Sequence, residues 1–137
     1  MGMTNITWIQ RENIEYLKIS FVGIFTYKDA EWASQQWKEQ FQAKPEQRIK
    51  VIFDALEMIN YEPSARSVWQ QTIAELSGQI DSIWLVTDSK LIVAGAKIMS
   101  IFTSFRINTV SSEDKVYEIN AKLAKVGDNQ TLREQLA

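Results

Sequence analysis

The sequence predicts an α/β sandwich with a mixed, mostly parallel sheet of about five strands, an N-terminal β-hairpin and about four helices. Residues 6–10 and 16–21 alternate apolar and polar side chains, the period of half-buried strands. The polar triplet 11–13 between them is short enough for an antiparallel hairpin. Beyond the hairpin, amphipathic helical patterns alternate with short apolar runs. Strands separated by helices pair in parallel through right-handed crossovers, which gives this fold class.

The first helix is predicted from its cap and its apolar stripe. Thr26 followed by Asp29 resembles a capping box, so a helix is expected to begin just after Thr26. Trp37 in this helix and Trp69 in the next lie on apolar stripes and are expected in the core. Trp32 points away from the stripe. It is either covered by another element or part of a contact surface.

The central strand and helix are expected to carry the functional surface. Residues 49–53 form an apolar run that predicts a strand buried on both faces. A polar turn containing Asp54 and Glu62 is expected next, and Pro63 then occupies the first position of a helix. Ligands of open α/β sheets bind where strands lead into helices, so residues 54–66 are the candidate site.

The rest of the chain repeats the alternation. Residues 82–86 and 107–110 predict two further strands. The helix between them is apolar over roughly half of its circumference, more than one core face requires. A fourth helix is predicted from Ser111 to Gly127, with a polar tail after it.

Length and charge limit the possible functions. A chain of 137 residues fits one domain over 1–137, with its core at about 6–126 and a polar tail at 127–137. The net charge of −2 argues against a nucleic-acid partner, because neutralising phosphates requires clustered Lys and Arg. No apolar run reaches the about 18 residues of a membrane span. The N-terminus does not resemble a secretory signal, so a cytoplasmic bacterial protein is expected.

The chain contains neither cysteine nor histidine. This excludes disulfides, thiolate and imidazole metal ligands, and Ser–His or Cys–His nucleophiles. Gly-rich phosphate loops and catalytic carboxylate clusters are not evident either. We therefore expect no catalytic residue, no metal and no cofactor, and hence no enzyme.

Three features carry a resemblance to a known family: the element order, the stretch VIFDALEMI leading into EPSARSVW, and the stretch DSIWLVTDSKLIVAGAKIMSIFTSFRI. Together, over residues 6–125, they resemble a STAS domain of the SpoIIAA-like, or anti-anti-sigma, group. In bacterial anti-anti-sigma factors, the turn after the central strand carries an Asp, then a Ser or Thr phosphorylated by a partner kinase, then Gly. The matching stretch is EPSA at 62–65, in which Ser64 is the only matching hydroxyl and Ala65 replaces the Gly.

The resemblance implies a regulatory domain that acts by reversible protein–protein docking, with an anti-sigma-type kinase as a possible partner. Ser64 is the candidate phosphorylation switch, although Ser is also common in the first turn of a helix. The extra apolar width of the third helix fits a partner protein, a homodimer or a lipid pocket. The expected partner-binding residues are Glu62, Ser64, Arg66, Trp32, Ile92 and Met99.

A carrier or sensor for an apolar small molecule or lipid is the alternative hypothesis. Some SpoIIAA-like proteins, to which this chain is also similar, are related to lipid-binding Sec14-type domains. The ligand would lie between the hairpin and the third helix, in a sizeable pocket. The residues expected to line that pocket are Trp84, Ile98, Phe102 and Phe105.

Overall fold

The computed structural model describes residues 2–136, with side chains up to residue 126, and contains one five-stranded sheet in the order β1-β2-β3-β4-β5. β1 and β2 pair antiparallel, and the remaining neighbours pair parallel. The strands are β1 (Met3–Arg11), β2 (Ile14–Phe25), β3 (Ile49–Tyr61), β4 (Ile80–Val86) and β5 (Ile107–Val110). The helices are α1 (Tyr27–Gln42), α2 (Pro63–Leu76), the 3-10 turn η1 (Ser77–Gln79), α3 (Lys90–Thr103) and α4 (Glu113–Leu136). The predicted fold class is confirmed.

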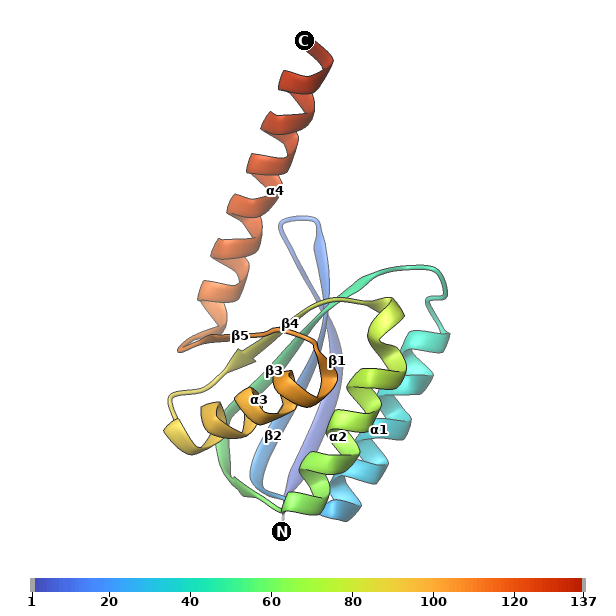
Figure 1. Ribbon diagram of the computed structural model, residues 1–137, viewed down its shortest axis with the longest axis vertical. Helices are drawn as coiled ribbons and strands as arrows, with labels where there is room; N and C mark the ends of the chain where they lie inside the picture. The colour runs from blue at the N-terminus through green and yellow to red at the C-terminus, as the bar shows by residue number, and fades with distance from the viewer. Residues whose placement is uncertain (1, 137) are drawn as a thin grey trace.

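The sheet separates two layers of unequal size (Figure 1). α1, α2 and α3 cover one side, which we call the three-helix face. α4 begins on the opposite side, the α4 face, and extends beyond the sheet. Alternation along β4 shows the division, because Ile83 and Leu85 join the three-helix core while Trp84 and Val86 join the smaller core under α4.

The hairpin and the first helix follow local sequence rules. Glu12 and Asn13 form a two-residue turn with φ of 50° and 66°, the left-handed geometry that suits the twist of a hairpin. The turn is therefore one residue shorter than predicted. The predicted capping box is confirmed: the Asp29 N–H donates to Thr26 Oγ1 at 3.2 Å, and the Thr26 N–H donates to Asp29 Oδ2 at 3.1 Å.

Aromatic side chains form the centre of the three-helix core. Trp37 and Trp69 are 0% and 3% exposed, as predicted, and their ring centroids lie 5.2 Å apart. Phe53 contacts both indoles, with centroid distances of 5.6 and 5.7 Å. α1 and α2 are therefore held to β3 by one continuous aromatic cluster.

The predicted turn at Asp54–Glu62 is wrong, because β3 continues as a strand to Tyr61. The register against β2 shifts twice, so that β3 holds extra residues on the way to Tyr61. Such bulges break the two-residue alternation, which explains why this stretch does not resemble a strand in the sequence. β4 pairs with β3 only as far as Asp54, and beyond it the strand has β2 as its only described neighbour in the sheet.

The predicted end of the last helix at Gly127 is also wrong, because α4 continues to Leu136. Only its first turns pack on the sheet, where Val116 is fully buried. Farther along, Ile119, Leu123 and Val126 are 37%, 58% and 55% exposed. These residues recur every three or four positions and form one apolar stripe facing solvent.

Candidate functional site

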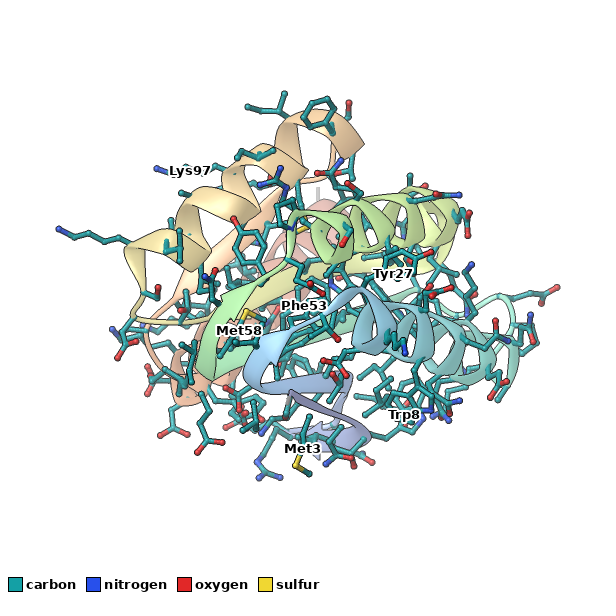
Figure 2. The ribbon with its side chains drawn as sticks, turned by 90° about the horizontal axis from the view of Figure 1, so that it is seen from below. Met3, Trp8, Tyr27, Phe53, Met58 and Lys97 are labelled. Carbon is teal, nitrogen blue, oxygen red and sulfur yellow. The ribbon has the colours of Figure 1, made fainter. Side chains whose placement is uncertain are left out.

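A small cavity lies on the three-helix face between α2, α3 and the second half of β3. Its volume is about 50 Å³, and its wall is almost entirely apolar. The strands contribute Phe21, Phe25, Phe53, Ala55, Met58, Tyr61, Leu85 and Ile107, and the helices contribute Arg66, Trp69, Ile92, Gly95, Ala96 and Met99. Figure 2 shows Phe53 and Met58 between the sheet and the helices. α3 covers the cavity from the outside.

The closest approach across this cavity joins α3 to the end of β3. A Cβ placed on Gly95 would lie 2.5 Å from the hydroxyl oxygen of Tyr61 and 2.8 Å from its Cζ. Any other residue at position 95 would therefore displace the ring. Glycine at this point lets the ring of Tyr61 lie directly under the α3 backbone.

Two hydrogen-bond donors beside the cavity have no acceptor among the described residues. They are Trp69 Nε1 and Arg66 Nε, and both atoms are enclosed. Trp69 is 3% exposed, whereas Arg66 is half-buried with its guanidinium 5.8 Å from the Tyr61 ring centroid. Buried donors are normally paired. The indole N–H of Trp37 in the same core also has no acceptor in the described part of the chain, so the cavity is distinguished by having two such donors among its lining residues.

α3 also carries exposed apolar side chains near its two ends. Leu91, Ile101 and Phe102 are 49%, 77% and 73% exposed, and Lys97 points outward from the same helix (Figure 2). The inner side of α3 buries only Ile92, Gly95 and Ala96. The predicted excess of apolar width on this helix is therefore present. It leaves three large apolar side chains exposed to solvent.

At the junction between β3 and α2, one of the predicted partner-binding residues has a structural role. The Glu62 carboxylate accepts a hydrogen bond of 2.8 Å from the Tyr27 N–H and so satisfies the start of α1. Ser64 is exposed in the first turn of α2. Trp32 is 52% exposed on α1, and Arg66 is partly exposed. The junction therefore leaves Ser64 and Trp32 accessible, whereas Glu62 has a structural partner.

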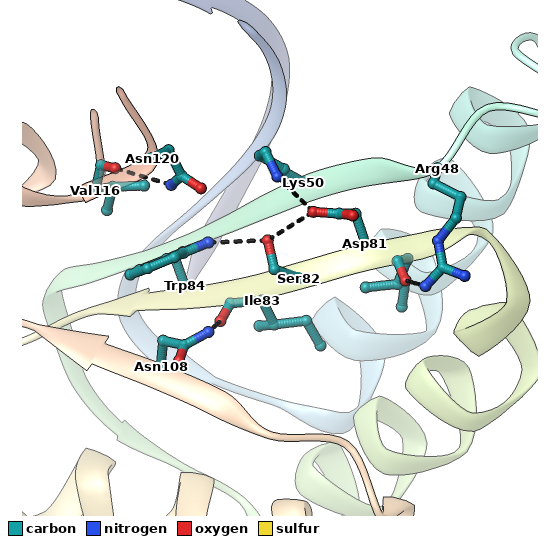
Figure 3. A network of polar contacts seen from close by, with 10 residues as sticks. Arg48, Lys50, Asp81, Ser82, Ile83, Trp84, Asn108, Val116 and Asn120 are labelled. Carbon is teal, nitrogen blue, oxygen red and sulfur yellow. Dashed lines mark hydrogen bonds and ion pairs between the residues drawn. The ribbon is translucent and has the colours of Figure 1, made fainter. Parts of the chain in front are cut away.

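The structure separates the residues expected to form one ligand pocket. Trp84 lies on the α4 face, where its indole N–H donates to Ser82 Oγ at 3.0 Å, on the same side of the sheet as Val116 and Asn120 of α4 (Figure 3). The sheet lies between Trp84 and α3. A single pocket lined by Trp84 together with α3 side chains is therefore wrong.

The other predicted site residues on α3 also lie at positions that differ from the prediction. Phe102 is exposed, and Ile98 and Phe105 are half-buried outside the cavity wall. Ile92 and Met99, expected at a partner surface, line the cavity instead, and Ile92 is only 5% exposed. The ligand position between the hairpin and α3 stays a prediction, and β2 contributes two phenylalanines to the wall of the cavity beneath α3.

Sequence reasoning missed Tyr61 and the cavity role of Trp69. One signal was available: Gly95 in the middle of an otherwise apolar helix indicates close approach of another group. The partner of that glycine was not predictable, because the bulges in β3 determine where Tyr61 ends up.

A second polar cluster holds α4 on the sheet. Lys18 Nζ lies 2.6 Å from a Glu113 carboxylate oxygen and 3.5 Å from one of Asp54, and the Tyr117 hydroxyl donates to Glu113 at 2.6 Å. Burial acts to raise the pKa of Glu113, but the hydrogen bonds from Lys18 and Tyr117 and the charge of Lys18 outweigh it and lower that pKa. Burial raises the pKa of Tyr16, beneath the same helix, to about 12. This cluster is a structural clasp, and the described residues contain no group of acidic side chains arranged for a metal ion.

Comparison with solved structures gives the fold a name. An uncharacterised DUF3478-family protein from Shewanella loihica PV-4, described as having a SpoIIAA-like fold, matches with a TM-score of 0.70 and 13% identity over 84% of this chain and 91% of its own. This chain has the SpoIIAA-like fold. The anti-sigma factor antagonist SpoIIAA in its unphosphorylated form matches with a TM-score of 0.61 and 12% identity, covering 88% of this chain and 98% of that chain.

Sequence comparisons give no narrower assignment, since no family model and no curated protein sequence matches the chain. At 12–13% identity the SpoIIAA-like structures establish the architecture alone. Among the residues that the structure describes, no helix is long and apolar enough to cross a membrane. The function therefore has to be argued from the site itself.

Proposed function

We propose that this chain is a non-enzymatic binding domain that docks on a regulatory protein through the exposed apolar side chains in the C-terminal turn of α3. The observation that carries the proposal is the exposure of Ile101 and Phe102, both above 70%, on a helix whose inner side already packs on the core. Large exposed apolar side chains grouped on one element are typical of interaction surfaces. The fold of the anti-sigma factor antagonist SpoIIAA supports a protein partner, and an anti-sigma-type kinase is the partner class we favour.

Ser64 stays the candidate phosphorylation switch. Its side chain is exposed in the first turn of α2, where a phosphate would gain from the free N–H groups and the helix dipole. Trp32 stays a candidate contact on the neighbouring helix α1. A cytoplasmic location is part of the same proposal, because kinase partners of this type act there.

Site-specific photocross-linking in cells tests the docking surface. A photoreactive phenylalanine analogue in place of Phe102 should give one discrete adduct with a single protein, identified by mass spectrometry. The same analogue in place of Gln71, exposed on α2, serves as the matched control and should give none. Equal labelling at both positions, or no adduct at Phe102, would contradict docking through α3.

Binding of an apolar small molecule beneath α3 is the second candidate function. The specific observation in its favour is the apolar cavity with two unpaired donors on its wall. The cavity is about 50 Å³, well below the roughly 300 Å³ at which pockets for drug-sized ligands begin. A ligand of any size would therefore require α3 to move outward. Of the two helices at the cavity, α3 is the better suited to move, because three of its residues are buried whereas α2 buries four.

A further inference from the structure

The donors at the cavity wall indicate what kind of group the cavity would accept. Arg66 and Trp69 lie three positions apart on α2, so their side chains project from neighbouring points of one helix face. Both Arg66 Nε and Trp69 Nε1 are N–H donors that cannot accept a hydrogen bond. The group that would satisfy them together is an acceptor with at least two lone pairs.

The charge of Arg66 narrows the class of acceptor further. Each of the five ion pairs among the described residues uses a lysine, and none uses Arg66. Arg66 is half-buried and lines the apolar cavity, and its guanidinium forms no ion pair with a carboxylate of the described residues. A charge beside an apolar site is stabilised by an opposite charge, and guanidinium groups favour carboxylate because of their matching geometry.

We infer that the cavity beneath α3 binds a small monocarboxylate with an apolar body, the carboxylate accepting from Arg66 Nε and Trp69 Nε1 and the body lying against Met58 and Met99. This inference rests on the second candidate function, ligand binding in the same cavity. Its new content is the chemical class of the head group. The cavity volume of about 50 Å³ favours a short chain over a long acyl lipid.

An ordered water is the competing occupant. A cavity of this size holds water, and one water molecule can accept from two donors. A water would leave the site indifferent to added carboxylates. Water and carboxylate therefore make opposite predictions in a titration.

Indole N–H signals in proton–nitrogen NMR spectra provide the test. The chain has five tryptophans, and the Trp69 signal is assigned by its loss in Trp69→Phe. We expect pentanoate to shift this signal in a saturable manner, and its neutral isostere 1-pentanol to bind about tenfold more weakly or worse, as for loss of a charge-assisted hydrogen bond. Arg66→Gln should weaken pentanoate about tenfold and leave 1-pentanol unchanged. Arg11→Gln removes a cation near Tyr117 on the opposite face and should change neither.

The outcomes separate the inference from the function on which it rests. Equal binding of pentanoate and 1-pentanol, unaffected by Arg66→Gln, would overturn the carboxylate assignment and leave the cavity as an apolar site. If neither compound shifts the Trp69 signal, both the carboxylate assignment and ligand binding are overturned in favour of water. If Arg66→Gln does not fold, Arg66→Lys replaces it. That variant keeps the charge, lacks the Nε donor and should still weaken pentanoate relative to the parent chain.

Discussion

Gly95 and Tyr61 show how one residue sets the geometry of the candidate site. The Tyr61 ring occupies the space in which a side chain at position 95 would lie. Glycine in a helix interior costs about 1 kcal/mol relative to alanine, so its presence in α3 requires a compensating contact. The approach of Tyr61 is that contact. It also closes the cavity from the side of β3.

A pair of substitutions tests this coupling. Gly95→Ala alone should destabilise the chain by about 1–2 kcal/mol, because the overpacking cost exceeds the gain in helix propensity. In a Tyr61→Ala background the obstruction is absent, and the same change should stabilise the protein by up to about 1 kcal/mol. Urea unfolding of the four chains gives the coupling energy. The same effect of Gly95→Ala in both backgrounds would show that the two residues do not interact.

A residue's role could be predicted from the sequence where that role depends only on residues nearby in the chain. The capping box at Thr26 and Asp29 was predictable because both partners lie within one helical turn. Trp84 was misplaced because a short apolar strand buried on both faces does not reveal which face each side chain takes. The orphan donors of Arg66 and Trp69 could not be predicted, since they depend on the packing of three other elements.

At the scale of elements, α4 is held to the sheet by charge as much as by apolar packing. Val116 is the one buried apolar residue among its described side chains, and the Lys18–Glu113 pair lies at its first turn. The pKa of Glu113 is lowered in the folded chain, so the pair contributes stability above the unfolded pKa of about 4.5. The contribution is lost as the pH falls through the lowered pKa. Burial acts to lower the pKa of Lys18, but its partners Glu113 and Asp54 outweigh burial and raise that pKa. On the alkaline side, the stability contributed by the pair therefore persists up to the ordinary lysine pKa of 10.5.

Because the pKa of Glu113 is lowered, the clasp should lose stability at acidic pH. Between pH 6 and pH 3 the parent chain should lose about 1 kcal/mol of unfolding free energy that Glu113→Gln does not lose, the size expected for a partly exposed pair. Urea unfolding at the two pH values measures it. Glu118→Gln, an exposed position on the same helix, is the matched control and should keep the parent slope. A Glu113→Gln slope identical to that of the parent would show that the pair contributes nothing.

Element boundaries were predictable where the sequence pattern is regular. The start of α2 at Pro63 and the first half of β3 follow from local signals. The second half of β3 was mistaken for a turn because Asp54, Glu57 and Asn60 are polar and the bulges remove the alternation. α4 continues past Gly127, a reminder that glycine weakens a helix without having to end it.

At the scale of the molecule, the two faces of the sheet leave different surfaces open. The three-helix face carries the cavity and the exposed apolar side chains of α3, and the α4 face carries the clasp and the exposed stripe of α4. Both candidate functions use α3, either as a docking surface or as the cover of a ligand site. The homodimer stays a prediction. It is predicted from the apolar width of α3, and the stripe formed by Ile119, Leu123 and Val126 on α4 is a second exposed apolar surface.

Amide hydrogen exchange of the unliganded chain tests most directly whether α3 is a separable recognition element. α3 buries three residues, whereas α1 buries five, so α3 should open locally without global unfolding. We expect α3 amides to exchange at least about tenfold faster than those of α1, an opening free energy lower by about 1.4 kcal/mol or more. Protection of α3 equal to that of α1 would mean that the helix opens only when the whole domain unfolds, and would contradict its role as a movable cover and binding element.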